Sequence, residues 1–218
     1  MDQNDFILQN LEIDKDKFGR IYSFVDFGNV NSWFRKSEEP FLGRLLKENE
    51  RFSVDIIKLG GFVDLFSNKK FFYYGVDPHK DGSKHIQRVA RKGARFKTVS
   101  KFIQRIKHYI EKDEYSDEER KILSEDGRGV YVEIPKCNFD VEMTVDILRH
   151  INEYDTLAIF TSDSDFAYLL SYLKQKGKKV ILFYYGPTSY VLKKYPNLKI
   201  NAQRIRDLIV FIKQIPPF

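Results

Sequence analysis

Three short apolar runs constrain the fold of this chain more than any other feature. They cover residues 21–25 (IYSFV), 157–161 (LAIFT) and 180–185 (VILFYY). Each is too short for a helix and too apolar for an exposed edge strand. Stretches with helical spacing follow or precede them, at 139–152, 165–176 and 189–194. Alternating buried strands and helices indicate parallel pairing through right-handed crossovers, so we expect an α/β fold with three α/β/α layers and a mostly parallel, Rossmann-like sheet.

The remaining elements are less regular. Shorter patterns predict strands at 70–75 and 95–99 and a helix at 83–92. We also expect helices at 31–51, 102–123 and 204–213, and a turn at 126–129. A length of 218 residues suits one domain, residues 1–218, with a charged insertion around 100–128.

Basic residues are concentrated in one part of the chain. The net charge is +6 and the isoelectric point is near 9.1. From 84 to 112 the sequence contains ten basic residues and almost no acid. Such a segment suits a polyanionic partner, although a solvated charged face explains it equally well. The candidates for nucleic-acid contact are Arg88, Arg91, Lys92 and Lys136, and Lys136 has the alternative of being an ordinary exposed lysine.

Other features restrict the class of protein. There is no uncharged apolar run of the length that a membrane span needs. The first ten residues contain acids and amides rather than the basic and apolar stretches of a signal peptide. A single cysteine, Cys137, cannot form an internal disulfide. We therefore expect a cytoplasmic protein without a membrane partner, and leave open whether it forms a homo-oligomer.

Acidic residues follow the predicted strands. Asp26 ends the first run, and Asp163 and Asp165 follow the run at 157–161. Ligands bind beyond the carboxyl ends of parallel strands, so these acids should share one edge of the sheet. Asp140 and Asp146 lie on the helix that leads into the second of these strands. Carboxylates in such a group suit Mg²⁺ or Mn²⁺.

Each acid also has a simpler explanation. Asp163 or a neighbouring serine could cap the next helix, and Asp26 with Gly28 could form a turn. Capping uses one acid and leaves the other unexplained. Asp140 and Asp146 are six residues apart, about 240° around a helix, so they converge only if Asp140 lies at its start. Glu142, one turn before Asp146, is the alternative to Asp140.

Bringing these carboxylates together costs electrostatic free energy unless a cation is bound. At an effective dielectric near 20, two carboxylates about 4 Å apart repel by roughly 4 kcal/mol. A group of four or five acids must therefore bind a metal or stay partly protonated. Two divalent ions about 4 Å apart would support phosphodiester hydrolysis.

At these residues the chain resembles the NYN family, nuclease-like domains related to the PIN superfamily. The resemblance is carried by FVDFGNV at 24–30, KCNFDVEMTVD at 136–146 and TSDSDF at 161–166, followed by GKKVILF. Cys137-Asn138 stands where glycine is commoner in the family, and Ser162 replaces a usual glycine. The resemblance implies a PIN-like fold and the site residues Asp26, Asn29, Asp140, Asp146, Asp163 and Asp165.

The resemblance also implies an activity. Family members are proposed to be metal-dependent ribonucleases, so we expect a hydrolase that cleaves RNA with Mg²⁺ or Mn²⁺. Asp26, Asp140 and Asp163 would be the metal ligands, with Asn29 in support. The alternative is a non-catalytic RNA-binding or scaffold module with the same fold.

Overall fold

The computed structural model describes residues 2–35, 40, 43–78, 81–111 and 123–214. Six strands form the central sheet in the order β10-β9-β8-β1-β3-β4, and every neighbouring pair is parallel. Their bounds are β1 (Ile21–Asp26), β3 (Lys69–Tyr73), β4 (Lys97–Val99), β8 (Thr156–Phe160), β9 (Lys179–Tyr184) and β10 (Leu198–Asn201). The predicted parallel α/β sheet is confirmed, and all six strands end at the same edge.

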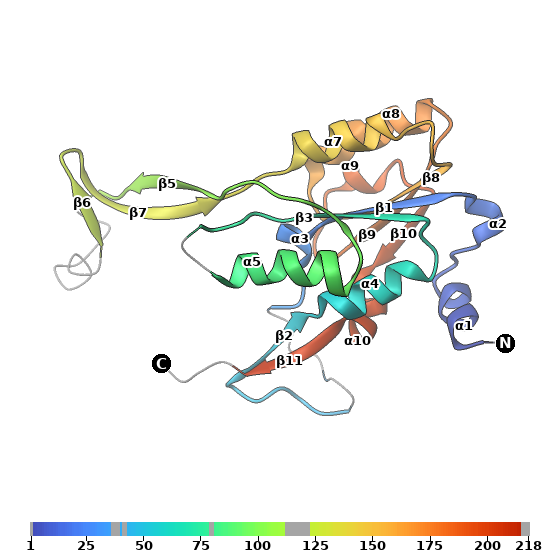
Figure 1. The fold of residues 1–218 in the computed structure, drawn as a ribbon, viewed down its shortest axis with the longest axis horizontal. Helices are drawn as coiled ribbons and strands as arrows, with labels where there is room; N and C mark the ends of the chain where they lie inside the picture. The colour runs from blue at the N-terminus through green and yellow to red at the C-terminus, as the bar shows by residue number, and fades with distance from the viewer. Residues whose placement is uncertain (1, 36–39, 41–42, 79–80, 112–122, 215–218) are drawn as a thin grey trace.

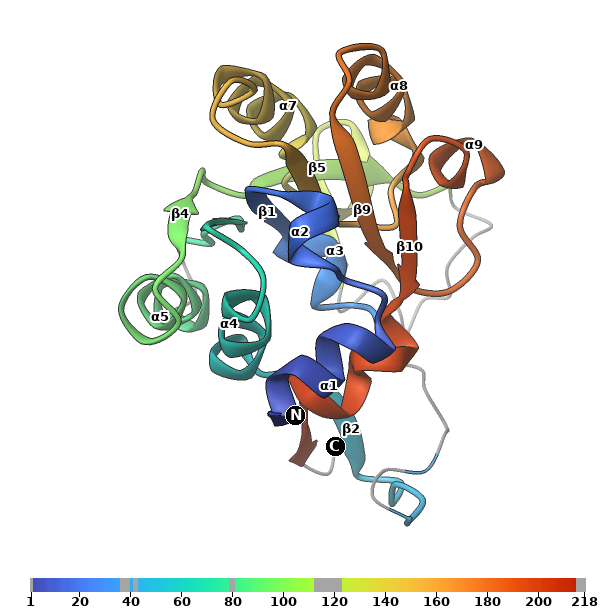
Figure 2. The ribbon, with the colours of Figure 1, turned by 90° about the vertical axis from the view of Figure 1, so that its right-hand side faces the viewer.

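Helices cover both faces of this sheet (Figures 1 and 2). Side chains of the central strand β1 alternate between two hydrophobic clusters: Ile21 and Val25 face one, Tyr22 and Phe24 the other. One face packs against α7 (Asp140–Arg149), α8 (Ala167–Gln175) and α9 (Tyr190–Lys193). The other packs against α4 (Ile56–Asp64), the π-helical turn η1 (Val89–Gly93) that continues α5 (Asp81–Arg88), and α10 (Arg206–Ile209). These are the three predicted layers.

Short elements complete the described chain. They are α1 (Gln3–Asn10), α2 (Lys15–Phe18), α3 (Phe27–Val30), η2 (Ser164–Phe166) and η3 (Ala202–Ile205). Within the part of the chain that the structure describes, no helix has the length and apolar character needed to cross a lipid bilayer.

Two of the predicted helices differ from the structure: the first is replaced by turns and a strand, and the second is helical only up to Ile209. The helix expected at 31–51 is replaced by turns after α3 and by β2 (Glu50–Val54), although residues 36–39 and 41–42 lie outside the described residues. The helix expected at 204–213 stops at Ile209, where β11 (Val210–Gln214) begins. β11 and β2 form a separate antiparallel pair. This long-range pairing buries Phe52 and Val210, which local helical spacing cannot predict.

The helix expected at 102–123 is also wrong in its described part. β5 (Gln104–Tyr109), β7 (Gly129–Lys136) and β6 (Ser124–Asp126) form an antiparallel three-stranded sheet, here called the ribbon. It projects away from the central sheet (Figure 1). Cross-strand contacts, such as the tilted ring pair of Tyr109 and Tyr131, override the helical pattern of its charges. The turn predicted at 126–129 joins β6 to β7, whereas residues 112–122 lie outside the described residues.

Two adjacent glycines in α4 have opposite surroundings. A Cβ atom added to Gly60 would lie 2.6 Å from the Cβ of Ala94 and 3.1 Å from its carbonyl oxygen. A Cβ added to Gly61 meets no atom within 4 Å. Gly60 therefore allows α4 to approach the end of η1, whereas Gly61 only weakens the helix.

We expect Gly60→Ala to lower the free energy of unfolding by about 1–3 kcal/mol, because the added methyl group forces α4 away from Ala94. Gly61→Ala should raise it by up to about 1 kcal/mol through helix propensity. Urea denaturation of both variants measures the difference. Equal effects of the two substitutions would contradict this close approach.

Candidate metal centre

Three carboxylates meet at the carboxyl edge of the central sheet. Oxygens of Asp140, Asp163 and Asp165 all lie within 4.8 Å of one another. Asp163 and Asp165 come from the loop and turn after β8, and Asp140 is the first residue of α7. Asp140 and Asp163 are partly buried, whereas Asp165 is exposed. These three residues are called the acid cluster below: Asp163 and Asp165 reach it from a strand end, and Asp140 reaches it from a helix start.

The loop after β8 is fixed by hydrogen bonds between its side chains and backbone groups. The Ser162 hydroxyl donates to the Tyr185 carbonyl and accepts from the Tyr185 amide, both at 3.0 Å. Asp163 caps η2 by accepting from the Asp165 amide at 3.0 Å. The capping explanation therefore accounts for one oxygen of Asp163, and the Asp165 side chain is left for the cluster.

Asp26 lies beside the acid cluster, at the end of β1. One of its oxygens accepts from the Asn29 amide at 3.2 Å, so it also caps α3. The other accepts from the Thr161 hydroxyl at 3.4 Å. Thr161 in turn accepts from the Asp163 amide at 3.1 Å and so joins the two strand ends.

Asn29 holds the loops after β1 and β8 together. Its side-chain carbonyl accepts from the Ser162 amide at 3.0 Å and from the Trp33 ring nitrogen at 2.8 Å. The predicted supporting residue, Asn29, therefore connects the two loops through its side-chain hydrogen bonds.

Asn138 orients Asp140 at the start of α7. Its side-chain amide donates to an Asp140 oxygen at 2.6 Å, and its carbonyl accepts from the Asp140 backbone at 2.8 Å. Glu142, the alternative acid, instead accepts from Lys101 at 2.6 Å and lies outside the cluster. Position at the helix start, rather than a shared helix face, brings Asp140 to the site.

Burial and mutual repulsion raise the pKa of two of these acids. The pKa of Asp26 rises from 3.8 to about 6, chiefly because it is buried, with further increases from the charges of Asp140 and Asp163. The pKa of Asp140 is raised by burial and by Asp163 and Asp165, while the Asn138 hydrogen bond opposes the change. The group is thus under electrostatic strain that a cation would relieve.

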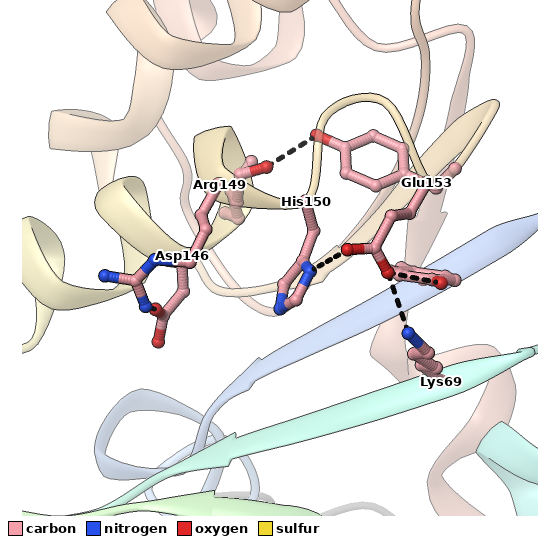
Figure 3. Close-up of polar contacts among 8 residues, drawn as sticks. Lys69, Asp146, Arg149, His150 and Glu153 are labelled. Carbon is pink, nitrogen blue, oxygen red and sulfur yellow. Dashed lines mark hydrogen bonds and ion pairs between the residues drawn. The ribbon is translucent and has the colours of Figure 1, made fainter.

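Asp146 does not join the cluster. One of its oxygens accepts from the Tyr73 hydroxyl at 2.9 Å and the other from Arg149 at 2.6 Å. Figure 3 shows Asp146 with Arg149 of the same helix, and a second group after the end of α7 in which Glu153 accepts from Lys69 of β3 and contacts His150. The structure gives Asp146 the role of fixing α7 to β3.

The predicted nucleic-acid contacts are dispersed. Arg88, Arg91 and Lys92 lie on α5 and η1, which pack with α4 on the sheet face opposite to α7. Only Lys136, at the end of β7, is close in sequence to Asp140.

The expected basic surface is also reduced by acids from distant parts of the chain. Lys101 pairs with Glu142, Lys107 with Asp126, and Arg105 with Asp77 and Glu133. The segment from 84 to 112 is therefore not one continuous cationic face.

The donor set fits a hard divalent cation. Carboxylate oxygens are the ligands that Mg²⁺ and Mn²⁺ prefer, and Asp140, Asp163 and Asp165 bring theirs within reach of one ion. Two contributors were missed in the sequence, Thr161 and Asn138. The signal for Asn138 was its position two residues before Asp140, the spacing of a side-chain-to-backbone turn.

The raised pKa of Asp26 predicts that ionisation of this side chain lowers the free energy of unfolding. Its folded pKa exceeds its ordinary value, so the folded state holds the proton more tightly and stability falls as pH rises from 3.8 to about 6. In metal-free protein at about pH 7.5, Asp26→Asn should raise the free energy of unfolding by about 2–3 kcal/mol. The amide keeps an acceptor oxygen for the Asn29 contact, and its NH2 group can donate to the Thr161 hydroxyl in place of the second carboxylate oxygen.

Thermal unfolding of both proteins across this pH range measures the effect. The difference should vanish well below pH 3.8, where Asp26 is protonated in both states. A stabilisation that is independent of pH would contradict the assigned cause.

Comparisons with known proteins agree with this fold. A crystal structure of a protein of unknown function, VPA0982 from Vibrio parahaemolyticus RIMD 2210633, is similar with a TM-score of 0.55 and 20% identity. The match covers 91% of this chain and 99% of that chain, and at this identity it shows the fold alone. No curated protein matches the sequence. A sequence profile of the NYN domain matches residues 24–200, and the chain therefore belongs to the NYN domain family, which has a nuclease-like fold.

Proposed function

We propose that this protein is a metal-dependent nuclease that hydrolyses phosphodiester bonds in RNA. The observation that carries the proposal is the acid cluster, three carboxylates within 4.8 Å, beside an Asp26 whose pKa is raised to about 6. Such a group is costly unless it binds a cation. The nuclease-like fold of the family supports the reaction class, and the resemblance of its motifs to those of ribonucleases supports RNA as the substrate.

In the proposed site, Asp140, Asp163 and Asp165 hold Mg²⁺ or Mn²⁺, with Asp26 beside them as a further ligand. A divalent ion, when bound, supplies Lewis-acid stabilisation of the phosphoryl group and lowers the pKa of water. The chain's own contribution is orientation. Asn138 fixes Asp140, and Thr161 fixes both Asp26 and the Asp163 backbone.

The proposal assigns Asp146 a positioning role. Both of its oxygens are engaged, by Tyr73 and Arg149, and burial together with the Asp146 hydrogen bond raises the pKa of the Tyr73 hydroxyl. This bond ties the end of β3 to α7, whose first residue is Asp140. Loss of Asp146 should therefore disturb the site through α7 rather than remove a ligand.

Metal binding should stabilise the folded protein by mass action. At a free Mn²⁺ concentration about 100 times the dissociation constant, we expect a gain of roughly 2.7 kcal/mol, read as a rise in melting temperature. Asp163→Asn should abolish most of this gain, because it removes a ligand from the cluster. Asp155→Asn, at the opposite edge of the sheet, is the matched control and should keep it. A gain unchanged by Asp163→Asn would remove the support for a shared site.

Cleavage tests the enzymatic claim. The purified chain with Mn²⁺ should cut single-stranded RNA, and excess chelator should stop the reaction. Asp163→Asn should lower the rate by at least 100-fold, on the order of the loss that follows removal of a major electrostatic element from an active site. Gel analysis of labelled RNA measures the products. Activity that survives in this variant would overturn the catalytic assignment, and tight RNA binding without cleavage would favour the non-catalytic module.

A further inference from the structure

A groove lies where the ribbon joins the rest of the protein, at the start of β5 and the end of β7, next to the candidate metal centre. Its volume is about 270 Å³, and its walls include Phe102, Gln104 and Ile106 on one side and Lys136 and Asn138 on the other. Side chains alternate along an extended chain, so residues 102, 104 and 106 share one face. Lys136 pairs directly opposite Gln104 and points to the same face.

The groove is attached firmly to the site. Asn138, which lines it, also donates to the Asp140 carboxylate at 2.6 Å. Behind it, Cys137 and Ile103 pack on Gly75, just after β3, so closely that an added Cβ would lie 2.8 Å from the Cys137 sulfur. The Val76 backbone bonds to Lys101 and Ile103. The groove is therefore held against the carboxyl edge of the central sheet.

The groove combines an uncovered aromatic surface with a positive charge. The Phe102 side chain is 72% exposed and Ile106 is 46% exposed. Lys136 is exposed, and no ion pair to it is found among the described residues. The opposite face of the ribbon differs, because Arg105 and Lys107 there are paired with acids. Exposed apolar surface beside a free ammonium group favours a partly apolar, anionic ligand.

We propose that this groove binds an unpaired base and the adjoining phosphate of single-stranded RNA. The proposal rests on the nuclease function above and defines its substrate class. Phe102 would stack on the base, and Lys136 would pair with the phosphate. The volume is slightly below the roughly 300 Å³ of the smallest ligand pockets, which suits one base. In a duplex the bases stay stacked on one another, so no base face is available to stack on Phe102.

Fluorescence anisotropy with a short labelled oligouridylate tests the groove. All proteins carry Asp163→Asn so that the probe stays intact. Phe102→Ala should weaken binding roughly 5- to 150-fold, the range seen for loss of one base–aromatic stack. Lys136→Gln should reduce the slope of log affinity against log salt by about 0.7, the value for one phosphate contact on a single strand. A duplex of the same length should be insensitive to Phe102→Ala.

Matched controls lie far from the groove. Phe6→Ala removes an exposed aromatic ring from α1, and Lys199→Gln removes an exposed lysine from β10; neither should change the affinity or the salt slope. Unchanged melting temperatures show that the groove variants remain folded. If Phe102→Ala and Lys136→Gln bind like the parent, the groove inference is wrong even where cleavage by the unsubstituted chain succeeds.

The remaining outcomes separate the two proposals. Loss of binding in the groove variants, with no cleavage by the unsubstituted chain, supports the groove and overturns the nuclease function. Sedimentation velocity tests the other occupant of an apolar face, a second copy of the chain. A dimer that Phe102→Ala dissociates, with RNA affinity unchanged, would overturn the groove proposal.

Discussion

Repulsion among carboxylates at one edge of the sheet is the constraint on which the rest of the site depends. Burial, together with the charges of Asp140 and Asp163, raises the pKa of Asp26 to about 6. A chain folding without a cation must oppose this repulsion with other interactions. The buried strands provide them, because β1, β8 and β9 are apolar on both faces.

The hydrogen bonds around the acids show how the arrangement is kept. Backbone amides at the starts of α3 and η2 donate to Asp26 and Asp163, and the Asn29 amide favours the charged form of Asp26. Helix capping and metal binding are therefore not competing explanations here. The same carboxylate uses one oxygen to start a helix and leaves the other facing its neighbours.

Local patterns predicted those parts of the fold whose residues are buried by their nearest neighbours in the sheet. The runs at 21–25, 157–161 and 180–185 are strands because parallel crossover units bury both of their faces. The patterns failed where distant segments decide the conformation. β2 pairs with β11, more than 150 residues away in the chain, and β5 pairs with β7 across a long connection. The helical spacing of charges at 102–123 is a local pattern and contains no information about such a distant partner strand.

The candidate site divides in the same way. Strand ends located Asp26, Asp163 and Asp165, since topology alone brings them to one edge. The sequence does not reveal that Tyr73 and Arg149 occupy both oxygens of Asp146, which lies outside the acid cluster. The basic segment was misleading for a related reason: Glu142 and Asp77, from other elements, neutralise Lys101 and Arg105.

The segment from 136 to 140 connects the last residue of β7 in the ribbon to Asp140 of the acid cluster. Lys136 ends β7, Asn138 holds Asp140, and Asp140 begins α7. Lys136 thus lies two residues before Asn138, whose hydrogen bond sets the position of a carboxylate. Because Asn138 lines the groove and also orients Asp140, a ligand in the groove that moves Asn138 would also act on the metal centre through this one side chain. Thermodynamic linkage makes that influence reciprocal: a strand that favours the observed Asn138 position strengthens metal binding, and the metal strengthens binding of the strand to the same degree.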